Sequence, residues 1–360
     1  MKPVYDTSVR IGGFLLFLAA CGHDHTPPPA NIDGAIDAPP AIVEDIHFYG
    51  RWDALHAAGW PGSSVVTRFT GTELRATIRE TGDDWLEIVV DGTARAPIHL
   101  ANGMQTVTLV AGLSAGEHDI EIVKRTESFV GTMRFDGFVG ATLVPTPRAS
   151  RLVEFIGDSI TAGYGVLGQN PCGFSNATEA ESRAWGYLAA HELGAAHQAI
   201  AYSGIGMYRN CCGGGTPNAN TMPIKYARMF ADQPSPAWGF TAAPDVVVIG
   251  LGTNDFNGGD PGVAYEEAYE RFIADSVRAH APNAPILLAT SSMMGGTGRT
   301  QMRARLDAIA AHFADPKITV VEIAEQQQAD GIGCDYHPSE ATQRKMAAQL
   351  VPAIRAAAGW

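Results

Sequence analysis

Hydrophobic residues in the second half of the chain form short continuous runs, separated by polar or glycine-rich segments. Such runs are typical of buried parallel strands, because both faces of a parallel sheet are covered. They predict strands at Leu152–Ile156, Ala196–Ala201, Val246–Leu251, Ile286–Thr290 and Ile318–Ile323. The intervals predict helices at Arg183–Leu193, Met222–Phe230, Ala264–His280, Thr300–Phe313 and Ser339–Ala357. This alternation predicts an α/β domain over residues 150–360, with a parallel sheet between two helical layers.

Residues 45–146 show a different pattern, in which apolar and polar positions alternate over short runs. Examples are Leu86–Val90, Gln105–Leu109 and His118–Val123, and turn pairs such as Asp91-Gly92 separate the runs. Alternation with turns at this spacing predicts an antiparallel β-sandwich, joined to the α/β domain by the hinge Pro145-Thr146-Pro147.

A β-sandwich in front of an α/β domain has two interpretations. It binds carbohydrate, or it packs against the α/β domain and forms one wall of its cleft. We favour the second interpretation, because no triplet of exposed aromatic residues is evident. Trp52, Trp60 and Trp85 fit core or turn positions as well as they fit sugar platforms.

The first 20 residues have the pattern of a signal peptide rather than a folded element. Lys2 and Arg10 precede the apolar run Ile11–Ala20, which is too short to span a membrane as a helix. The run ends in Leu18-Ala19-Ala20-Cys21, which resembles a bacterial lipobox and predicts lipidation of Cys21. An ordinary signal peptide with a chance cysteine is the alternative. Residues 21–44 are rich in proline and predict a flexible tether, so we expect a lipid-anchored protein of the bacterial cell envelope.

The charge of the chain limits the classes of partner. The 25 Lys and Arg residues against 38 Asp and Glu residues give a net charge of −13. This balance argues against nucleic acid and against electrostatic attachment to an anionic membrane, whereas neutral glycans remain compatible with it.

Three polar segments follow predicted strands or feed a helix, and together they suggest catalysis. Ser159 lies just after the first strand, Asn254 follows the third, and His337 precedes the last helix. Because the carboxyl ends of parallel strands are where α/β sheets place reactive groups, these residues predict a nucleophile, an oxyanion donor and a base. The structural alternative is that Gly157-Asp158-Ser159 forms only a capped turn.

Asp335 is the candidate for orienting His337. An extended backbone would send these two side chains to the same face, which favours a Ser–His–Asp triad. The alternative is a Ser159–His337 dyad, in which a backbone carbonyl holds the imidazole. Asp158 and Asp255 are expected to brace the two loops rather than react.

The chain resembles the SGNH (GDSL-type) hydrolases through the blocks G-D-S-I at 157–160, G-T-N-D at 252–255 and D-Y-H-P at 335–338. The glycine-containing loop at 201–210 and the phrases of the front domain, such as Lys124-Arg125-Thr126-Glu127, resemble the family-two carbohydrate esterases and their jelly-roll domain. The resemblance covers roughly residues 45 to 355 and implies an esterase that removes acetyl groups from plant polysaccharides such as xylan or glucomannan.

The resemblance also implies roles for individual residues. The N–H groups of Ser159 and Gly204 and the Asn254 amide would form the oxyanion hole, with Gly206 as the alternative glycine. Tyr336, beside the base, would stack on a sugar ring. No metal or cofactor is expected. The alternative functions are a lipase or lysophospholipase of the same superfamily, and a non-catalytic glycan-binding surface lipoprotein.

Export would leave four cysteines in a compartment where disulfides persist, namely Cys172, Cys211, Cys212 and Cys334. They allow three pairings. A bond between the adjacent Cys211 and Cys212 is geometrically awkward, so we expect each of them to pair with a distant cysteine. Zinc binding is disfavoured, because the spacing matches no C-x-x-C pattern.

Overall fold

The computed structural model describes residues 43–211 and 220–360. The expected signal peptide, the lipidation site Cys21, most of the expected tether and Cys212 lie outside the described residues. In the part of the chain that is described, no helix combines the length and apolar character needed to span a bilayer.

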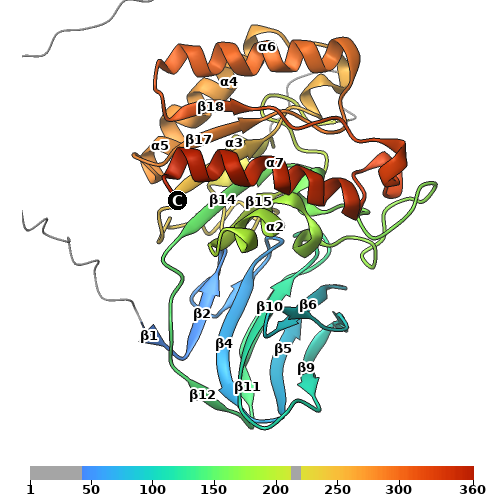
Figure 1. Cartoon of the computed structure of the whole chain (residues 1–360), viewed down its shortest axis with the longest axis vertical. Coiled ribbons are helices and arrows are strands. Elements are labelled where there is room, and N and C mark those ends of the chain that lie inside the picture. The colour runs from blue at the N-terminus through green and yellow to red at the C-terminus, as the bar shows by residue number, and fades with distance from the viewer. Residues whose placement is uncertain (1–42, 212–219) are drawn as a thin grey trace, which may run out of the picture. The chain divides into compact units, whose positions relative to one another are not determined.

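The second half of the chain forms the expected parallel sheet. Its strands are β14 (Leu152–Gly157), β15 (Ala196–Ala201), β16 (Val246–Gly250), β17 (Ile286–Ala289) and β18 (Ile318–Val321). Their order is β15-β14-β16-β17-β18, and all neighbouring pairs are parallel (Figure 1). The strand that carries Ser159 at its end therefore lies between the strands that precede Gly204 and Asn254.

Helices cover both faces of this sheet, as predicted (Figure 1). They are α1 (Ser159–Ala162), α2 (Trp185–Glu192), α3 (Met222–Tyr226), α4 (Val263–Phe272), α5 (Arg278–His280), α6 (Gly296–Phe313) and α7 (Glu340–Ala358), and a π-helical segment at Ile273–Val277 joins α4 to α5. Side chains of α2 and α7 pack on one face, and those of α3, α4 and α6 pack on the other. Short 3₁₀ helices lie at Glu181–Arg183, Asp255–Gly258, Gln328–Asp330 and Cys334–Tyr336.

One helix is only about half as long as predicted. The helix expected over Met222–Phe230 ends at Tyr226. The carbonyl groups of Tyr226 and Arg228 accept hydrogen bonds from the buried Arg51 guanidinium, so they do not continue the helical pattern.

The front of the chain is an antiparallel sandwich. One sheet contains β2 (Ile46–Tyr49), β4 (Ser64–Thr70), β6 (Trp85–Val90), β7 (Thr93–Ala94), β8 (Ile98–His99), β10 (Glu117–Lys124) and β12 (Thr142–Val144). The other contains β3 (Ala57–Ala58), β5 (Glu73–Glu80), β9 (Gly103–Ala111) and β11 (Met133–Val139), and β1 (Val43–Glu44) pairs with β13 (Thr146–Pro147).

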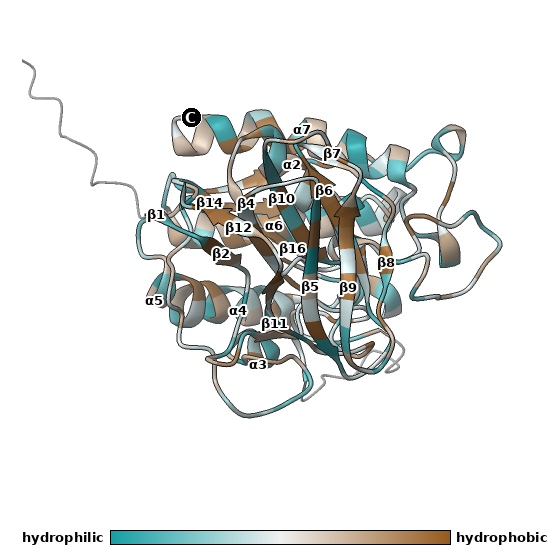
Figure 2. Cartoon of the chain, turned by 90° about the horizontal axis from the view of Figure 1, so that it is seen from below, coloured by the Kyte–Doolittle hydropathy of each residue, from teal (hydrophilic) through white to brown (hydrophobic). Residues whose placement is uncertain are grey.

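The difference in hydrophobic pattern between the two halves corresponds to a difference in burial. Apolar residues of both antiparallel sheets, including Phe69, Ile78 and Ile122, form one buried cluster. Along β5 the hydrophobic and hydrophilic residues alternate, whereas β14 and β16 are hydrophobic over nearly their whole length (Figure 2). A half-solvated antiparallel strand and a doubly covered parallel strand require these two patterns.

The sandwich packs against the α/β domain, as the favoured interpretation predicts. Trp60 is fully buried and belongs to the same apolar cluster as residues of β14 and β16. Arg51 lies over the rings of Trp60 and Tyr226, and Glu87 forms an ion pair with Arg183. Trp60 is therefore a junction residue and not a sugar platform.

Candidate active site

Ser159 is the first residue of α1, two residues after the end of β14. The side chain of Asp158 caps this short helix by accepting a hydrogen bond from the Ile160 N–H at 3.0 Å. Gly157 is required because a Cβ atom there would lie 2.0 Å from the Thr161 Oγ1 atom. The Gly-Asp-Ser turn thus holds the Ser159 hydroxyl at the carboxyl edge of the sheet, where only 8% of the residue is exposed.

His337 faces this hydroxyl from the loop before α7. Its Nε2 atom lies 2.8 Å from the Ser159 Oγ atom. On the other side of the ring, the Nδ1–H group donates to the carbonyl oxygens of Cys334 and Asp335, at 3.2 and 3.1 Å. These two bonds fix the tautomer in which Nε2 accepts the serine proton, so the geometry is that of a nucleophile and its general base.

The expectation that the Asp335 carboxylate orients His337 is wrong in this structure. The carboxylate accepts a hydrogen bond from the Tyr164 hydroxyl at 2.6 Å instead, and only the Asp335 carbonyl contacts the imidazole. The physical reason is the backbone: Asp335 has φ 49° and Tyr336 has φ 63°, so the segment is not extended. The alternation on which the triad argument depended does not apply to left-handed residues.

We expect Asp335→Asn to keep most of the activity. Asparagine tolerates the left-handed conformation and keeps an acceptor for Tyr164, and the carbonyl groups that hold His337 are unchanged. The predicted loss in kcat is at most about tenfold, against the order of 10⁴ for a disrupted triad. The measurement is steady-state kinetics on p-nitrophenyl acetate, and a defect equal to that of Ser159→Ala would restore Asp335 to a triad.

The pH profile should reflect the burial of the base. Burial lowers the pKa of the His337 imidazole from its ordinary value. A lower pKa keeps the base neutral, and hence active, into more acidic solution. We therefore expect the acidic limb of kcat/KM to have its midpoint below about pH 6.5, the ordinary value for histidine. A midpoint above about pH 7 would contradict this environment for the base.

The loops after β15 and β16 bring Gly204 and Asn254 to the same edge. The Asn254 Nδ2 atom donates to the Ile205 carbonyl at 2.7 Å and lies 3.4 Å from the Asp158 Oδ2 atom. The second contact is at the long limit of a hydrogen bond, so this amide hydrogen can turn to a better acceptor. None of the hydrogen bonds among the described residues uses the N–H of Ser159 or of Gly204.

The N–H of the alternative glycine, Gly206, already has a hydrogen-bond acceptor. Its N–H donates to the Asn210 Oδ1 atom at 3.0 Å, which leaves Gly204 as the loop glycine with an unused donor. Gly204 has φ 76°, and a Cβ atom there would lie 2.9 Å from the Cys211 Sγ atom. Both its conformation and its surroundings therefore favour glycine.

The two aspartates beside the site have the bracing positions expected of them. Asp255 accepts hydrogen bonds from the N–H groups of Met207, Tyr208 and Arg209, which ties the loop after β16 to the loop after β15. Asp158 is fully buried, and burial raises its pKa to about 7.

A disulfide joins Cys172 to Cys334, with their Cα atoms 4.7 Å apart. The expectation that Cys211 and Cys212 pair with these distant cysteines is therefore wrong. Hydrogen bonds from the N–H of Cys334 to the Gly165 carbonyl and from the N–H of Asp335 to the Cys172 carbonyl already bring the two loops together. The bond links the loop of His337 to the segment that follows the Ser159 helix.

Tyr164 is a site residue that the sequence analysis missed. Its ring stacks on His337, with the centroids 4.2 Å apart. Burial and the Asp335 carboxylate raise the pKa of Tyr164, so the phenol stays protonated and donates. Its position between two glycines, five residues after the nucleophile, is the available sequence signal.

Aromatic side chains continue from this ring toward the sandwich. Tyr164 contacts Phe174, which in turn contacts Phe129 from the sandwich. Phe129 is 46% exposed, and Tyr336, the residue beside the base, is 66% exposed. The front domain thus contributes an exposed aromatic ring to one wall of the site.

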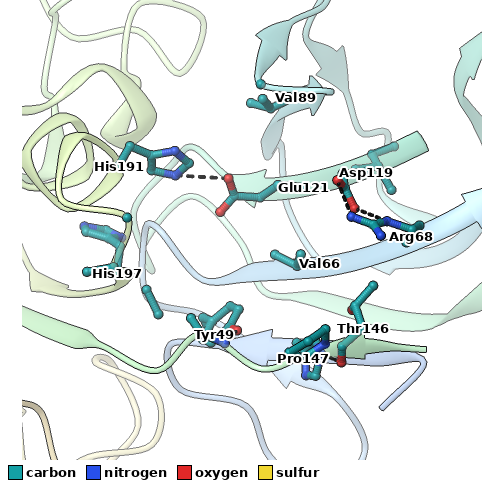
Figure 3. A pocket seen from close by; sticks show the side chains of 17 residues that line it. Tyr49, Val66, Arg68, Val89, Asp119, Glu121, Thr146, Pro147, His191 and His197 are labelled. Atoms are coloured by element: carbon teal, nitrogen blue, oxygen red, sulfur yellow. Dashed lines mark hydrogen bonds and ion pairs between the residues drawn. The ribbon is translucent and has the colours of Figure 1, made fainter. Parts of the chain in front are cut away.

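A cavity of about 460 Å³ lies elsewhere, between the sandwich and the first residues of β15 (Figure 3). Tyr49, Arg68 and Glu121 line it, and Glu121 is paired with His191. It adjoins the amino end of β15, whereas the loop of Gly204 follows the carboxyl end, so the cavity is separate from the Ser159 site. Within the described ranges, no group of three or more His, Cys, Asp or Glu residues could hold a metal ion.

Two protein families match the chain. Residues 48–147 match the family described as carbohydrate esterase 2 N-terminal, and residues 155–345 match the GDSL-like lipase/acylhydrolase family.

Individual relatives share both halves. The cellulase/esterase CelE of Acetivibrio thermocellus is 34% identical over 88% of this chain, which spans 40% of that protein's length. An acetylxylan esterase / glucomannan deacetylase of Cellvibrio japonicus is 28% identical over 100% of both chains. The structure is similar to that of a family two carbohydrate esterase from Clostridium thermocellum in complex with cellohexaose, with a TM-score of 0.82, 33% identity, and coverage of 88% of this chain and 99% of that one.

Proposed function

Because the chain belongs to the GDSL-like lipase/acylhydrolase family and, within it, to the family-two carbohydrate esterases, we propose that it removes O-acetyl groups from plant polysaccharides such as acetylated xylan or glucomannan. The observation that carries the chemistry is the 2.8 Å contact between Ser159 Oγ and His337 Nε2. The Cellvibrio japonicus relative is named for both of these polysaccharides.

The reaction would proceed through an acyl-enzyme. His337 takes the Ser159 proton as the hydroxyl oxygen attacks the acetyl carbonyl carbon. The N–H groups of Ser159 and Gly204 and the Asn254 amide meet the negative charge that develops on the carbonyl oxygen. The imidazolium then gives its proton to the departing sugar oxygen, and water activated by His337 releases acetate.

The groups around the dyad fit a glycan leaving group. Tyr336 and Phe129 present exposed rings on which a sugar can stack. A neutral glycan is also compatible with the net negative charge of the chain. The cellohexaose in the Clostridium thermocellum complex is an example of a glycan bound by a relative.

The test compares polysaccharide and p-nitrophenyl esters, and acetyl with octanoyl groups. We expect release of acetate from acetylated xylan and glucomannan, and a steep fall in kcat/KM from p-nitrophenyl acetate to p-nitrophenyl octanoate. A preference for octanoate would support the lipase alternative. Binding of these polysaccharides without acetate release would support the non-catalytic alternative.

We also propose that Cys21 carries a lipid that attaches the protein to the bacterial cell envelope. The support is the sequence Leu18-Ala19-Ala20-Cys21 after an apolar run, together with the proline-rich stretch that follows it. Metabolic labelling with a fatty acid tests this directly, since Cys21→Ser should abolish the label. Equal labelling of that variant, or secretion of unlabelled wild type, would overturn the proposal.

A further inference from the structure

Four consecutive polar residues of the sandwich, Lys124-Arg125-Thr126-Glu127, are buried. Three of them are charged, and charged residues are rarely buried without a specific partner. The segment begins at the last residue of β10, where the sandwich meets the α/β domain. The reaction outlined above uses none of these side chains.

The first two residues anchor this segment on both sides of the junction. Lys124 Nζ donates to Asp84 Oδ1 at 2.8 Å, which holds the segment to the sandwich. Arg125 Nη2 donates to the carbonyl of Glu179 at 3.0 Å, and the Arg125 carbonyl accepts from the N–H of Glu181. The position of Glu127 is therefore set by both domains.

The Glu127 carboxylate accepts hydrogen bonds from the loop that carries Gly204 of the oxyanion hole. Its Oε2 atom accepts from the Ser203 N–H at 2.5 Å, and its Oε1 atom accepts from the Ser203 hydroxyl. Ser203 directly precedes Gly204, so the peptide between them carries the Gly204 N–H. The two bonds hold the backbone N–H and the side chain of Ser203, the residue from which that peptide starts.

A second carboxyl group completes the arrangement. The Glu127 N–H donates to the Glu179 Oε2 atom at 3.1 Å. Burial raises the pKa of both carboxyl groups. The neighbouring Glu127 raises the pKa of Glu179 further, whereas the hydrogen bonds from Ser203 oppose the rise at Glu127. Glu127 is then the acceptor for both donors of Ser203.

We propose that Glu127 of the sandwich is a positioning residue for the oxyanion hole, which fixes Ser203 and thereby aims the Gly204 N–H at the reacting carbonyl. Glu179 supports it by accepting a hydrogen bond from the Glu127 N–H. The inference rests on the proposed esterase function, and it gives the front domain a part in catalysis that does not require glycan binding.

The test is Glu127→Gln, which keeps the shape of the side chain but offers only one oxygen for two Ser203 donors. We expect kcat on p-nitrophenyl acetate to fall at least about tenfold, short of the 10²–10³ typical of a lost oxyanion donor, with KM within about threefold. A boronic acid that mimics the tetrahedral intermediate should bind more weakly by a factor similar to the loss in kcat.

The matched control is Glu87→Gln, because Glu87 is also a buried sandwich carboxylate that reaches across the junction, to Arg183. It should lower the melting temperature while leaving kcat within about twofold, because the hydrogen bonds between Glu127 and Ser203 are unchanged. If Glu127→Gln does not fold, Ser203→Ala replaces it, with an expected loss in kcat of about threefold or more from one missing bond.

The outcomes separate this inference from the function on which it rests. An active wild type whose Glu127→Gln or Ser203→Ala variant keeps the kcat of the control would overturn the role of Glu127 alone. Equal losses of kcat in the Glu127 and Glu87 variants would reduce that role to general stability. A wild type without esterase activity would overturn both proposals.

Discussion

Ser159→Ala should lower the turnover of acetyl esters by a factor on the order of 10⁴ or more, and His337→Ala should do the same. The hydroxyl and the imidazole are 2.8 Å apart and act as one unit, since the serine is a poor nucleophile without its base. The double variant should therefore be hardly worse than either single one. Steady-state kinetics on p-nitrophenyl acetate give all three values.

Ser182→Ala is the control for this series. Ser182 is a buried serine of the same domain whose hydroxyl makes no hydrogen bond with the described residues. It should keep full activity, and circular dichroism should show that all variants remain folded. Turnover close to that of the wild type in either the Ser159 or the His337 variant would remove the assignment of the dyad.

Asn254→Ala should lower kcat by about 10²–10³ while changing KM little, because its amide meets charge that exists mainly in the transition state. The Ile205 carbonyl and Asp158 hold the amide beside the nucleophile turn before any substrate arrives. Asn257→Ala is the matched control, because Asn257 is exposed and only three residues away. A variant altered only in KM would make Asn254 a substrate-binding residue.

The parallel sheet and the convergence of its polar ends could be predicted from the sequence. A doubly covered strand needs a continuous apolar run, and that pattern is visible in Leu152–Gly157 and Val246–Gly250. Once these strands are neighbours, Ser159 and Asn254 must lie at the same edge. The part of the site that depends on strand position was therefore predictable.

The support of the base was not predictable, because it depends on local backbone conformation. Asp335 and Tyr336 both adopt positive φ values. Aspartate adopts them more often than most residues, but tyrosine does not, and two such residues in succession are not signalled by the sequence. This conformation turns the Asp335 carboxylate to Tyr164 and its carbonyl to His337. The loop that supports His337 was therefore predicted correctly, but the contact was assigned to the Asp335 carboxylate rather than to its backbone carbonyl.

Contacts across the junction of the two domains could not be predicted from the sequence either. Charged residues are usually exposed, so the residue types in Lys124-Arg125-Thr126-Glu127 do not predict that this run is buried. Its burial depends on partners such as Glu179, more than 50 residues away. The pairing of Cys172 with Cys334 depends on a loop contact of the same long-range kind.

The central claim is that Ser159 is a nucleophile activated by His337, and covalent labelling tests it most directly. The wild type is treated with a fluorophosphonate probe, and its peptides are analysed by mass spectrometry. We predict one label, on the peptide that contains Ser159, with no label there in Ser159→Ala and a labelling rate at least about 10²-fold lower in His337→Ala. A label on a different residue, or an undiminished rate in His337→Ala, would contradict the account.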